Sequence, residues 1–145
     1  MLKVGVNTYI TPEESMLLLQ WEPRGQDWIG LAAERKEYYL QCAAFQIDSQ
    51  PFAGRKSRPE QHMAFPRNGS KSVPEAVKLA QALEALALSD TQAAFRRQLQ
   101  EQGVTSISLG KASESYGTDR GGSGLADSEA RRLLRPYLLG GAVLA

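Results

Sequence analysis

The feature that most constrains the fold is residues 72–88, SVPEAVKLAQALEALAL, in which most positions are apolar or small. Their apolar side chains recur at three- and four-residue spacing, which predicts an α-helix. The centre of this pattern is formed by Val77, Ala80, Leu83 and Leu86, and further Ala and Leu residues widen the apolar face. A helix with so little polar surface is surrounded by other helices of its own chain or buried in an assembly.

Capping signals mark two helix starts. Thr11, Pro12 and Glu14 are typical of an N-cap, a first-turn proline and a capping-box acid, and they predict a short helix that ends near Pro23. Residues 72–75, Ser-Val-Pro-Glu, show the same pattern at the start of the apolar helix. The sequence therefore predicts a defined N-terminal boundary for both helices.

Another helix is predicted between these two, from about residues 27–30 to about Ser49. Its core-facing stripe is predicted from apolar residues at three-, four- and seven-residue spacing, namely Leu31, Tyr38, Cys42 and Phe45. On this interpretation Cys42 is a small buried hydrophobe that does not react in the native state. Trp21 and Trp28 are expected to pin the turn that precedes the helix.

The C-terminal third is predicted to contain helices and a short β arm. Asp90 is a candidate cap for a helix over residues 91–102, and the alternation in residues 104–116 predicts one or two short strands. The glycine-rich stretch that follows indicates a flexible linker. A last helix is predicted to begin at Asp127 or Ser128 and to end at the Gly140–Gly141 pair.

Together these elements predict a mainly α protein, a small helical bundle with a long Pro-rich basic loop, a short β-containing arm and a C-terminal docking helix. The length of 145 residues fits one globular unit with a modest core. We expect a helical core with the β arm over residues 1–116, a glycine-rich linker over 117–126, and a C-terminal helix and tail over 127–145.

Composition excludes several classes of function. The net charge of +1 gives no global field that would draw the protein onto nucleic acid or a membrane. One cysteine and one histidine rule out an internal disulfide framework and an ordinary Cys/His zinc cluster. No apolar run approaches the ~20 residues that span a bilayer. We therefore expect a soluble intracellular protein that does not contact membranes.

The candidate catalytic groups do not converge on one place. His62 is interpreted as a loop packing residue beside Met63, and the acids near the first helix are explained by capping and solvation. The stretch GTDRGGSG at residues 117–124 lacks the Gly-Lys-Ser/Thr ending of a phosphate-binding loop. We expect no enzyme, no catalytic residue, no bound metal and no cofactor.

Residues 50–72 form a proline-rich basic loop, the segment with the clearest functional signal. Its prolines stiffen the backbone, and one acid, Glu60, stands against the cations Arg55, Lys56, Arg58, Arg67 and Lys71. Because Phe52 and Phe65 are interleaved with these cations, the loop can contact phosphates while its rings stack on bases, as in single-strand binding proteins. The alternative is a solvated loop anchored by two buried aromatic residues, and the sequence leaves both open.

Several short motifs follow one another over nearly the whole chain. They are NTY at 7–9, TPEE at 11–14, MAFPRNG at 63–69, VPEAVKLAQALEALAL at 73–88, GVTSISLG at 103–110, SESY at 113–116 and SEARRLLRPYL at 128–138. This series resembles the small head-tail connector, or adaptor, proteins of tailed bacteriophages, whose relatives often carry the label DnaT-like single-stranded DNA-binding protein. Where those relatives usually have Trp before the Pro, this chain has Phe65.

The resemblance implies a structural virion protein of the neck, at the head-tail interface, that is assembled in the host cytoplasm. It implies a closed ring of roughly twelve copies beneath the portal, which continues the channel for double-stranded DNA. The implied partners are other copies, the portal protein and a tail-side connector or tail terminator protein. The residues implied to dock on the portal are Arg131, Arg132, Leu134, Pro136 and Tyr137, and those implied to be structural are Tyr9, Phe65, Pro66 and Arg67.

Two functional hypotheses follow. The first is a ring-forming connector, in which Arg55, Lys56, Arg58, Arg67 and Lys71 line the DNA channel or face a neighbouring subunit. The second is a single-stranded DNA-binding module, in which a strip on the same loop binds the strand. That strip comprises Arg55, Lys56, Arg58, Phe52 and Phe65.

Overall fold

The computed structural model describes residues 2–90 and 125–139, and within these ranges the chain is mainly helical. Its helices are α1 (Pro12–Leu18), α2 (Gly25–Ile29), α3 (Ala33–Asp48), α4 (Glu75–Ser89) and α7 (Ser128–Leu134), followed by the short 3₁₀ helix η1 (Arg135–Tyr137). Strand pairing in the described part of the chain is limited to isolated bridges. The predicted small helical bundle is confirmed. None of the helices described is long and apolar enough to cross a membrane.

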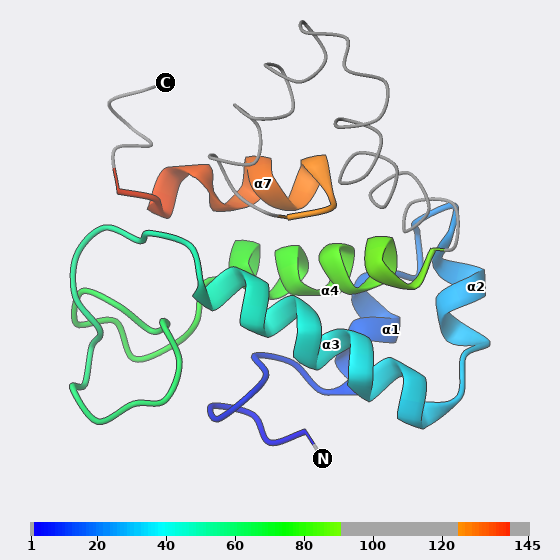
Figure 1. The fold of residues 1–145 in the computed structure, drawn as a ribbon, viewed down its shortest axis with the longest axis horizontal. Coiled ribbons are helices and arrows are strands. Elements are labelled where there is room, and N and C mark those ends of the chain that lie inside the picture. The colour runs from blue at the N-terminus through cyan, green and yellow to red at the C-terminus, as the bar shows by residue number, and fades with distance from the viewer. Residues whose placement is uncertain (1, 91–124, 140–145) are drawn as a thin grey trace, which may run out of the picture.

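Helix α4 lies at the centre of the bundle, between α3 and α7 (Figure 1). Its buried residues cover almost the whole circumference and include Val77, Ala80, Leu83 and Leu86. The prediction of a helix surrounded on several sides is therefore confirmed. The helices that cover it belong to the same chain, so α4 needs no neighbouring copy to be buried.

The two predicted capping boxes have different outcomes. At α1 the backbone N–H of Glu14 donates to the Thr11 hydroxyl over 3.1 Å, and the Thr11 N–H donates to the Glu14 carboxylate over 3.0 Å. At α4 the predicted box is wrong, because Pro74 keeps an extended backbone with ψ 144° and is itself the N-cap. Ser72 then lies too far upstream to cap the first helical N–H groups.

The single long helix predicted before Ser49 is interrupted, and its core-facing stripe is wrong. The segment forms α2 and α3, with a break over residues 30–32. The face of α3 that meets the core comprises Leu40, Ala43, Ala44 and Ile47, whereas Phe45 is 75% exposed. Ala43 and Ala44 let α3 approach α4 closely, and an aromatic ring in that seam would hold the two helices apart.

Polar side chains inside the bundle join its elements. The Gln81 amide of α4 accepts from the Tyr9 N–H over 2.9 Å, and it donates to the Thr8 hydroxyl over 2.7 Å and to the Leu40 carbonyl over 2.9 Å. Because every bond is made in a fully buried site, the amide fixes the N-terminal segment and α3 against α4 at once.

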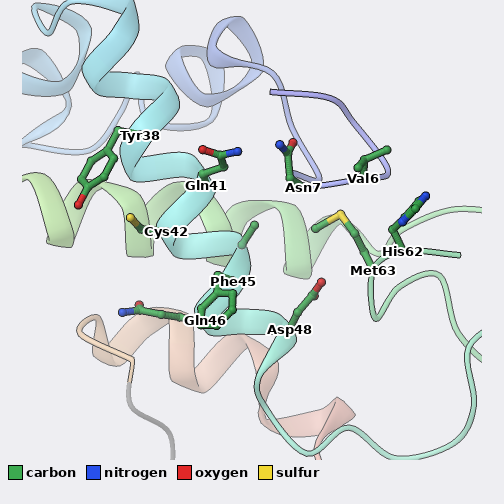
Figure 2. Close-up of a pocket in the computed structure, with 11 residues that line it drawn as sticks. Val6, Asn7, Tyr38, Gln41, Cys42, Phe45, Gln46, Asp48, His62 and Met63 are labelled. Carbon is green, nitrogen blue, oxygen red and sulfur yellow. The ribbon is translucent and has the colours of Figure 1, made fainter. Parts of the chain in front are cut away.

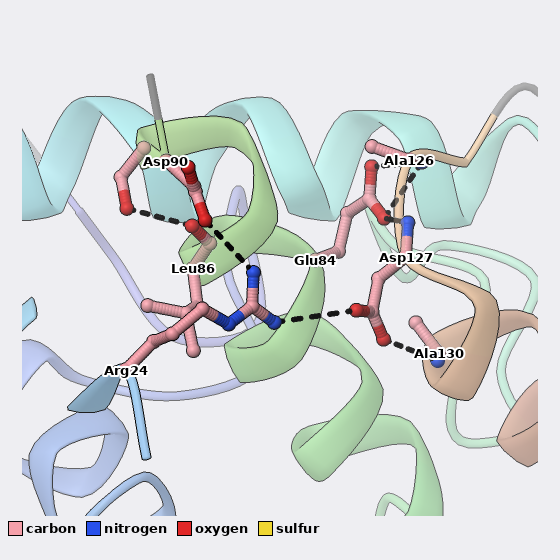
Figure 3. A network of polar contacts seen from close by, with 8 residues as sticks. Arg24, Glu84, Leu86, Asp90, Ala126, Asp127 and Ala130 are labelled. Carbon is pink, nitrogen blue, oxygen red and sulfur yellow. Dashed lines mark hydrogen bonds and ion pairs between the residues drawn. The ribbon is translucent and has the colours of Figure 1, made fainter. Parts of the chain in front are cut away.

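Helix α7 is part of this same core. Ala130 and Leu134 are fully buried, and the buried Glu84 carboxylate accepts backbone N–H groups from Ala126 and Asp127 over 2.9–3.0 Å (Figure 3). The expectation of a terminal helix set apart from the core is not met. Helix α4 packs against the buried side of α7, and its Glu84 carboxylate accepts the backbone N–H groups that precede α7. The predicted helix over 91–102, the β arm over 104–116 and the linker up to residue 124 lie outside the described residues.

Candidate functional site

The basic loop lies at one end of the bundle, at the opposite end of α3 from α2 (Figure 1). Four of its five predicted cations are exposed, namely Arg55, Lys56, Arg58 and Lys71. Arg67 differs, because its guanidinium donates to the carbonyls of Ala53 over 3.0 Å, Gly54 over 2.7 Å and Ala64 over 3.1 Å. Arg67 therefore shapes the loop and is not a free cation for a channel or a phosphate.

The aromatic residues of the loop point inward. Phe65 is buried, and its ring packs edge-on against Tyr9, Phe52 and Tyr137 with centroid separations of 6.1, 4.7 and 5.6 Å. The half-buried ring of Phe52 is also covered by the guanidinium of Arg67. The predicted stacking on bases is wrong for the buried Phe65. Both rings anchor the loop, as in the alternative interpretation, although Phe52 is half-buried and not fully buried.

The terminal segment is tied to this loop. The Ala53 N–H donates to the Tyr137 carbonyl over 2.9 Å, and the Leu139 N–H donates to the Pro51 carbonyl over 2.6 Å. Of the residues predicted to dock on the portal, Leu134 belongs to the core and Tyr137 to the aromatic cluster around Phe65. These two side chains are structural.

The other predicted docking residues lie nearer the surface. Arg132 and Pro136 are exposed, and Arg132 forms an ion pair with Glu129 one turn before it. Arg131 is half-buried, and its Nε has no hydrogen-bond partner. Of the predicted docking residues, Arg132 on α7 and Pro136 on η1 are therefore the two at the surface.

A pocket of about 670 Å³ lies on the outer face of α3, where the helix meets the N-terminal segment and the basic loop (Figure 2). We call it the α3 pocket, and its main lining residues are Val6, Tyr38, Cys42, Phe45, His62 and Met63. Tyr38, Cys42 and Phe45 belong to the stripe that the sequence placed in the core, and of that stripe only Leu31 packs against the core as predicted. The prediction of a buried Cys42 is wrong, because its thiol is only half-buried and lines this pocket.

The polar groups of the α3 pocket are not arranged for catalysis. The Tyr9 hydroxyl donates to the Asp48 carboxylate at one end, and burial raises the pKa of both groups above their ordinary values. Electrostatic repulsion from Cys42 and a side-chain hydrogen bond with it raise the pKa of Tyr38. His62 is exposed at the rim, although the sequence indicated a packing residue. Within residues 2–90 and 125–139, no three His, Cys, Asp or Glu side chains group as metal ligands.

Large apolar side chains are also exposed on α1, on α2 and on the turn between them. Trp28 pins the α2 segment as predicted, being fully buried with its indole N–H donating to the Ser15 hydroxyl over 2.9 Å. Trp21 does not, because 86% of it is exposed. The large apolar residues exposed in this part of the chain are Leu17, Trp21 and Ile29, which we call the Trp21 surface.

Comparison with known proteins identifies the family. A family model described as "Putative DnaT-like ssDNA binding protein" matches residues 2–144. The chain belongs to this family. The match bears out the DnaT-like label that the motif series suggested, and it does not address a head-tail connector. No curated protein and no solved structure matches the chain significantly.

For this DnaT-like chain, the structure bears out the predicted exposure of every loop cation except Arg67, and it differs from the sequence prediction at the exposed apolar residues. Arg55, Lys56 and Arg58 are exposed as both hypotheses require. The α3 pocket and the Trp21 surface were missed, because the sequence assigned Phe45 and Trp21 to the interior. A signal was present in the neighbouring Ala43–Ala44 pair, which offers α3 a second, closer-packing apolar stripe.

Proposed function

We propose that the protein is a structural virion component, a ring-forming connector that joins the portal to the tail and continues the DNA channel. The observation that carries this proposal is that one copy exposes two different apolar surfaces, the α3 pocket and the Trp21 surface. Closed rings are built from heterologous contacts, in which each copy contributes two unlike surfaces. The motif series that resembles phage connectors supplies the location in the neck.

The exposed loop cations fit a channel better than a tight binding site. Arg55, Lys56, Arg58 and Lys71 are spread along one loop, and the rings that could grip bases are turned inward. Dispersed cations without stacking partners attract the DNA backbone while allowing it to slide. In the proposed ring, each copy contributes these cations to the wall around the double-stranded DNA.

Electron microscopy of particles from the phage that encodes the chain tests this proposal, with the gene intact and deleted. We expect a ring of this protein below the portal in intact particles, and heads that lack tails or have lost DNA when the gene is deleted. Full, tailed and infectious particles without the protein would contradict the connector role.

A second candidate function is a single-stranded DNA-binding module. It is favoured by the family description and by the exposed cations Arg55, Lys56 and Arg58. If each cation neutralises a phosphate, binding should weaken with salt at a slope of roughly −0.7 per contact on single strands. A connector should instead bind oligonucleotides weakly at physiological salt.

Fluorescence anisotropy with a labelled oligonucleotide separates the two. The variant Arg55→Gln, Lys56→Gln, Arg58→Gln removes the three cations, and Lys3→Gln with Arg35→Gln removes exposed cations elsewhere as a matched control. We expect weak binding by all three proteins. Tight, salt-dependent binding that only the triple variant loses would favour the second function.

A further inference from the structure

We infer that copies of this chain join head to tail, with the Trp21 side chain of one copy seated in the α3 pocket of the next. This inference rests on the proposed connector function and adds to it the two surfaces that meet. It draws on the geometry of Trp21, the shape of the pocket and the distribution of charge.

Trp21 is held in solvent by an ordered turn. The preceding Leu19 is fully buried, its carbonyl accepts from the Glu22 N–H over 3.1 Å, and the Glu22 carbonyl accepts from the Gly25 N–H over 2.9 Å. The turn is also tight, since a Cβ on Gly25 would lie 2.1 Å from the Leu19 carbonyl oxygen. A large apolar side chain on such a base loses little conformational freedom when a partner covers it.

The α3 pocket suits an indole. Its volume of about 670 Å³ exceeds what one aromatic side chain needs, and the rings of Tyr38 and Phe45 stand at its edge (Figure 2). Rings in this position can pack edge-on against an incoming indole. Gln41 on the pocket wall carries an amide oxygen that can accept the indole N–H.

Charge selects a second copy as the occupant. Residues 12–30, which carry the Trp21 surface, contain four acids and one base, Arg24, which forms an ion pair with Asp90 over 3.0 Å. Residues 51–71, which contribute His62 and Met63 to the α3 pocket, contain four exposed bases and one exposed acid, Glu60, while Arg67 is held by loop carbonyls. Helix α2 and the basic loop lie at opposite ends of α3 (Figure 1).

The opposite charges attract when the Trp21 surface of one copy meets the pocket end of another. Two copies joined through identical ends would instead bring like charges together, which opposes a symmetric dimer. A pair of copies joined in this way still has a free Trp21 surface on one copy and a free α3 pocket on the other. Further copies can therefore add until the chain of copies closes into a ring.

Cross-linking tests the contact directly, since Cys42 in the α3 pocket is the native cysteine. The variant Gln20→Cys places a second thiol beside Trp21 and leaves that side chain intact. A short bismaleimide that has first reacted at position 20 is carried to the pocket beside Trp21, where free reagent is excluded, and should link position 20 of one copy to Cys42 of the next, giving a ladder of covalent multimers. Ser128→Cys, an exposed position on α7, is the matched control and should give no ladder.

Adding Trp21→Ala to Gln20→Cys should reduce the ladder more than tenfold, because a buried interface Trp is a typical hot spot. Circular dichroism should stay unchanged, as Trp21 is exposed in the single copy. A ladder that persists without Trp21 would overturn the inference and leave the connector function standing. Dimers alone would indicate a symmetric contact and also overturn it.

Other occupants of the pocket are outcomes of the same experiment. A small apolar molecule that co-purifies with the protein in native mass spectrometry, with no ladder, would overturn the head-to-tail contact. Absence of any multimer together with absence of the protein from phage particles would overturn the proposed function itself.

Discussion

Helices α3 and α4 have nearly equal lengths, 16 and 15 residues, but they occupy opposite kinds of environment. Helix α4 is buried around most of its circumference, whereas α3 buries one side and turns Tyr38 and Phe45 outward. The core thus contains α4, which is covered on nearly all sides, and α3, whose second apolar face stays exposed in the single copy. This difference separates residues that stabilise the fold of one copy from residues that are free to contact a second copy.

Packing distance explains which face of α3 turns inward. The inward face combines Leu40 and Ile47 with the small residues Ala43 and Ala44, so the backbone can approach α4. Interiors are close-packed, and the gain from dispersion falls quickly when a gap opens between surfaces. The stripe that contains Tyr38 and Phe45 has the right helical spacing, but its side chains are too large for the close contact between α3 and α4.

The largest expected effect comes from uncovering α4. Deleting residues 125–145 removes the buried Ala130 and Leu134 and the two N–H groups that satisfy Glu84. The apolar face of α4 would then be exposed to water, and the Glu84 carboxylate would lose the N–H groups that it accepts. We therefore expect loss of cooperative folding. Circular dichroism and a thermal melt measure this. A truncated protein that melts cooperatively at the wild-type temperature would show that α7 is dispensable for the core.

Matched truncations on the two helices sharpen the comparison. Leu83→Ala on α4 should lower the free energy of unfolding by about 2–5 kcal/mol, because it leaves a cavity in the core. Phe45→Ala on α3 removes a larger side chain, yet it should change stability by no more than about 0.5 kcal/mol since the ring is exposed. Denaturant titration of both variants checks this. Equal losses would mean that Phe45 is part of the core.

Removing the charge of Glu84 on α4 should have a smaller effect on stability. Glu84→Gln keeps the size of the side chain but removes the charge that accepts N–H groups from residues 126 and 127. We expect a loss of about 1–3 kcal/mol, as for other buried groups that lose a charged hydrogen-bond partner. Glu75→Gln, on the exposed first turn of the same helix, is the control and should be nearly neutral. Equal effects from the two variants would contradict the anchoring role.

A sequence without a structure could predict α4 but not the orientation of α3. Apolar residues on every side of α4 make its burial independent of helix rotation, and the Thr11–Glu14 capping box depends only on local contacts. Helix α3 carries two apolar stripes with the same period, so the choice between them depends on the distance to a neighbour that the sequence does not contain.

The same limit applies to the candidate sites. Trp21 lies in the turn after α1, whereas Trp28 lies in α2, and the fold buries Trp28 in the core, where its indole N–H meets the Ser15 hydroxyl. The positions of Arg55, Lys56 and Arg58 at the surface could be predicted because charge on a proline-rich loop rarely finds a buried partner. The resemblance implied a structural Arg67, but its four carbonyl partners could not be predicted, since they are set by the loop path.

The smallest expected effect concerns pH and the end of α3. Burial raises the pKa of Asp48, so the folded protein keeps a proton that the unfolded chain has already lost. Its contribution to stability is therefore complete below a pH of about 4, the ordinary carboxyl pKa, and declines as the pH rises through the raised folded value. Between these limits, wild-type stability should fall with rising pH relative to Asp48→Asn. A difference between the two proteins that does not vary with pH would contradict this.

The central claim is that the outer face of α3 is left open in one copy and covered by another. The most direct measurement is the rate at which a maleimide modifies Cys42 in the wild-type protein, followed by intact mass at increasing protein concentration. We predict modification of the folded protein at low concentration and progressive protection as copies associate, with circular dichroism unchanged. A rate that is the same at every concentration, or a thiol that reacts only after unfolding, would contradict the claim.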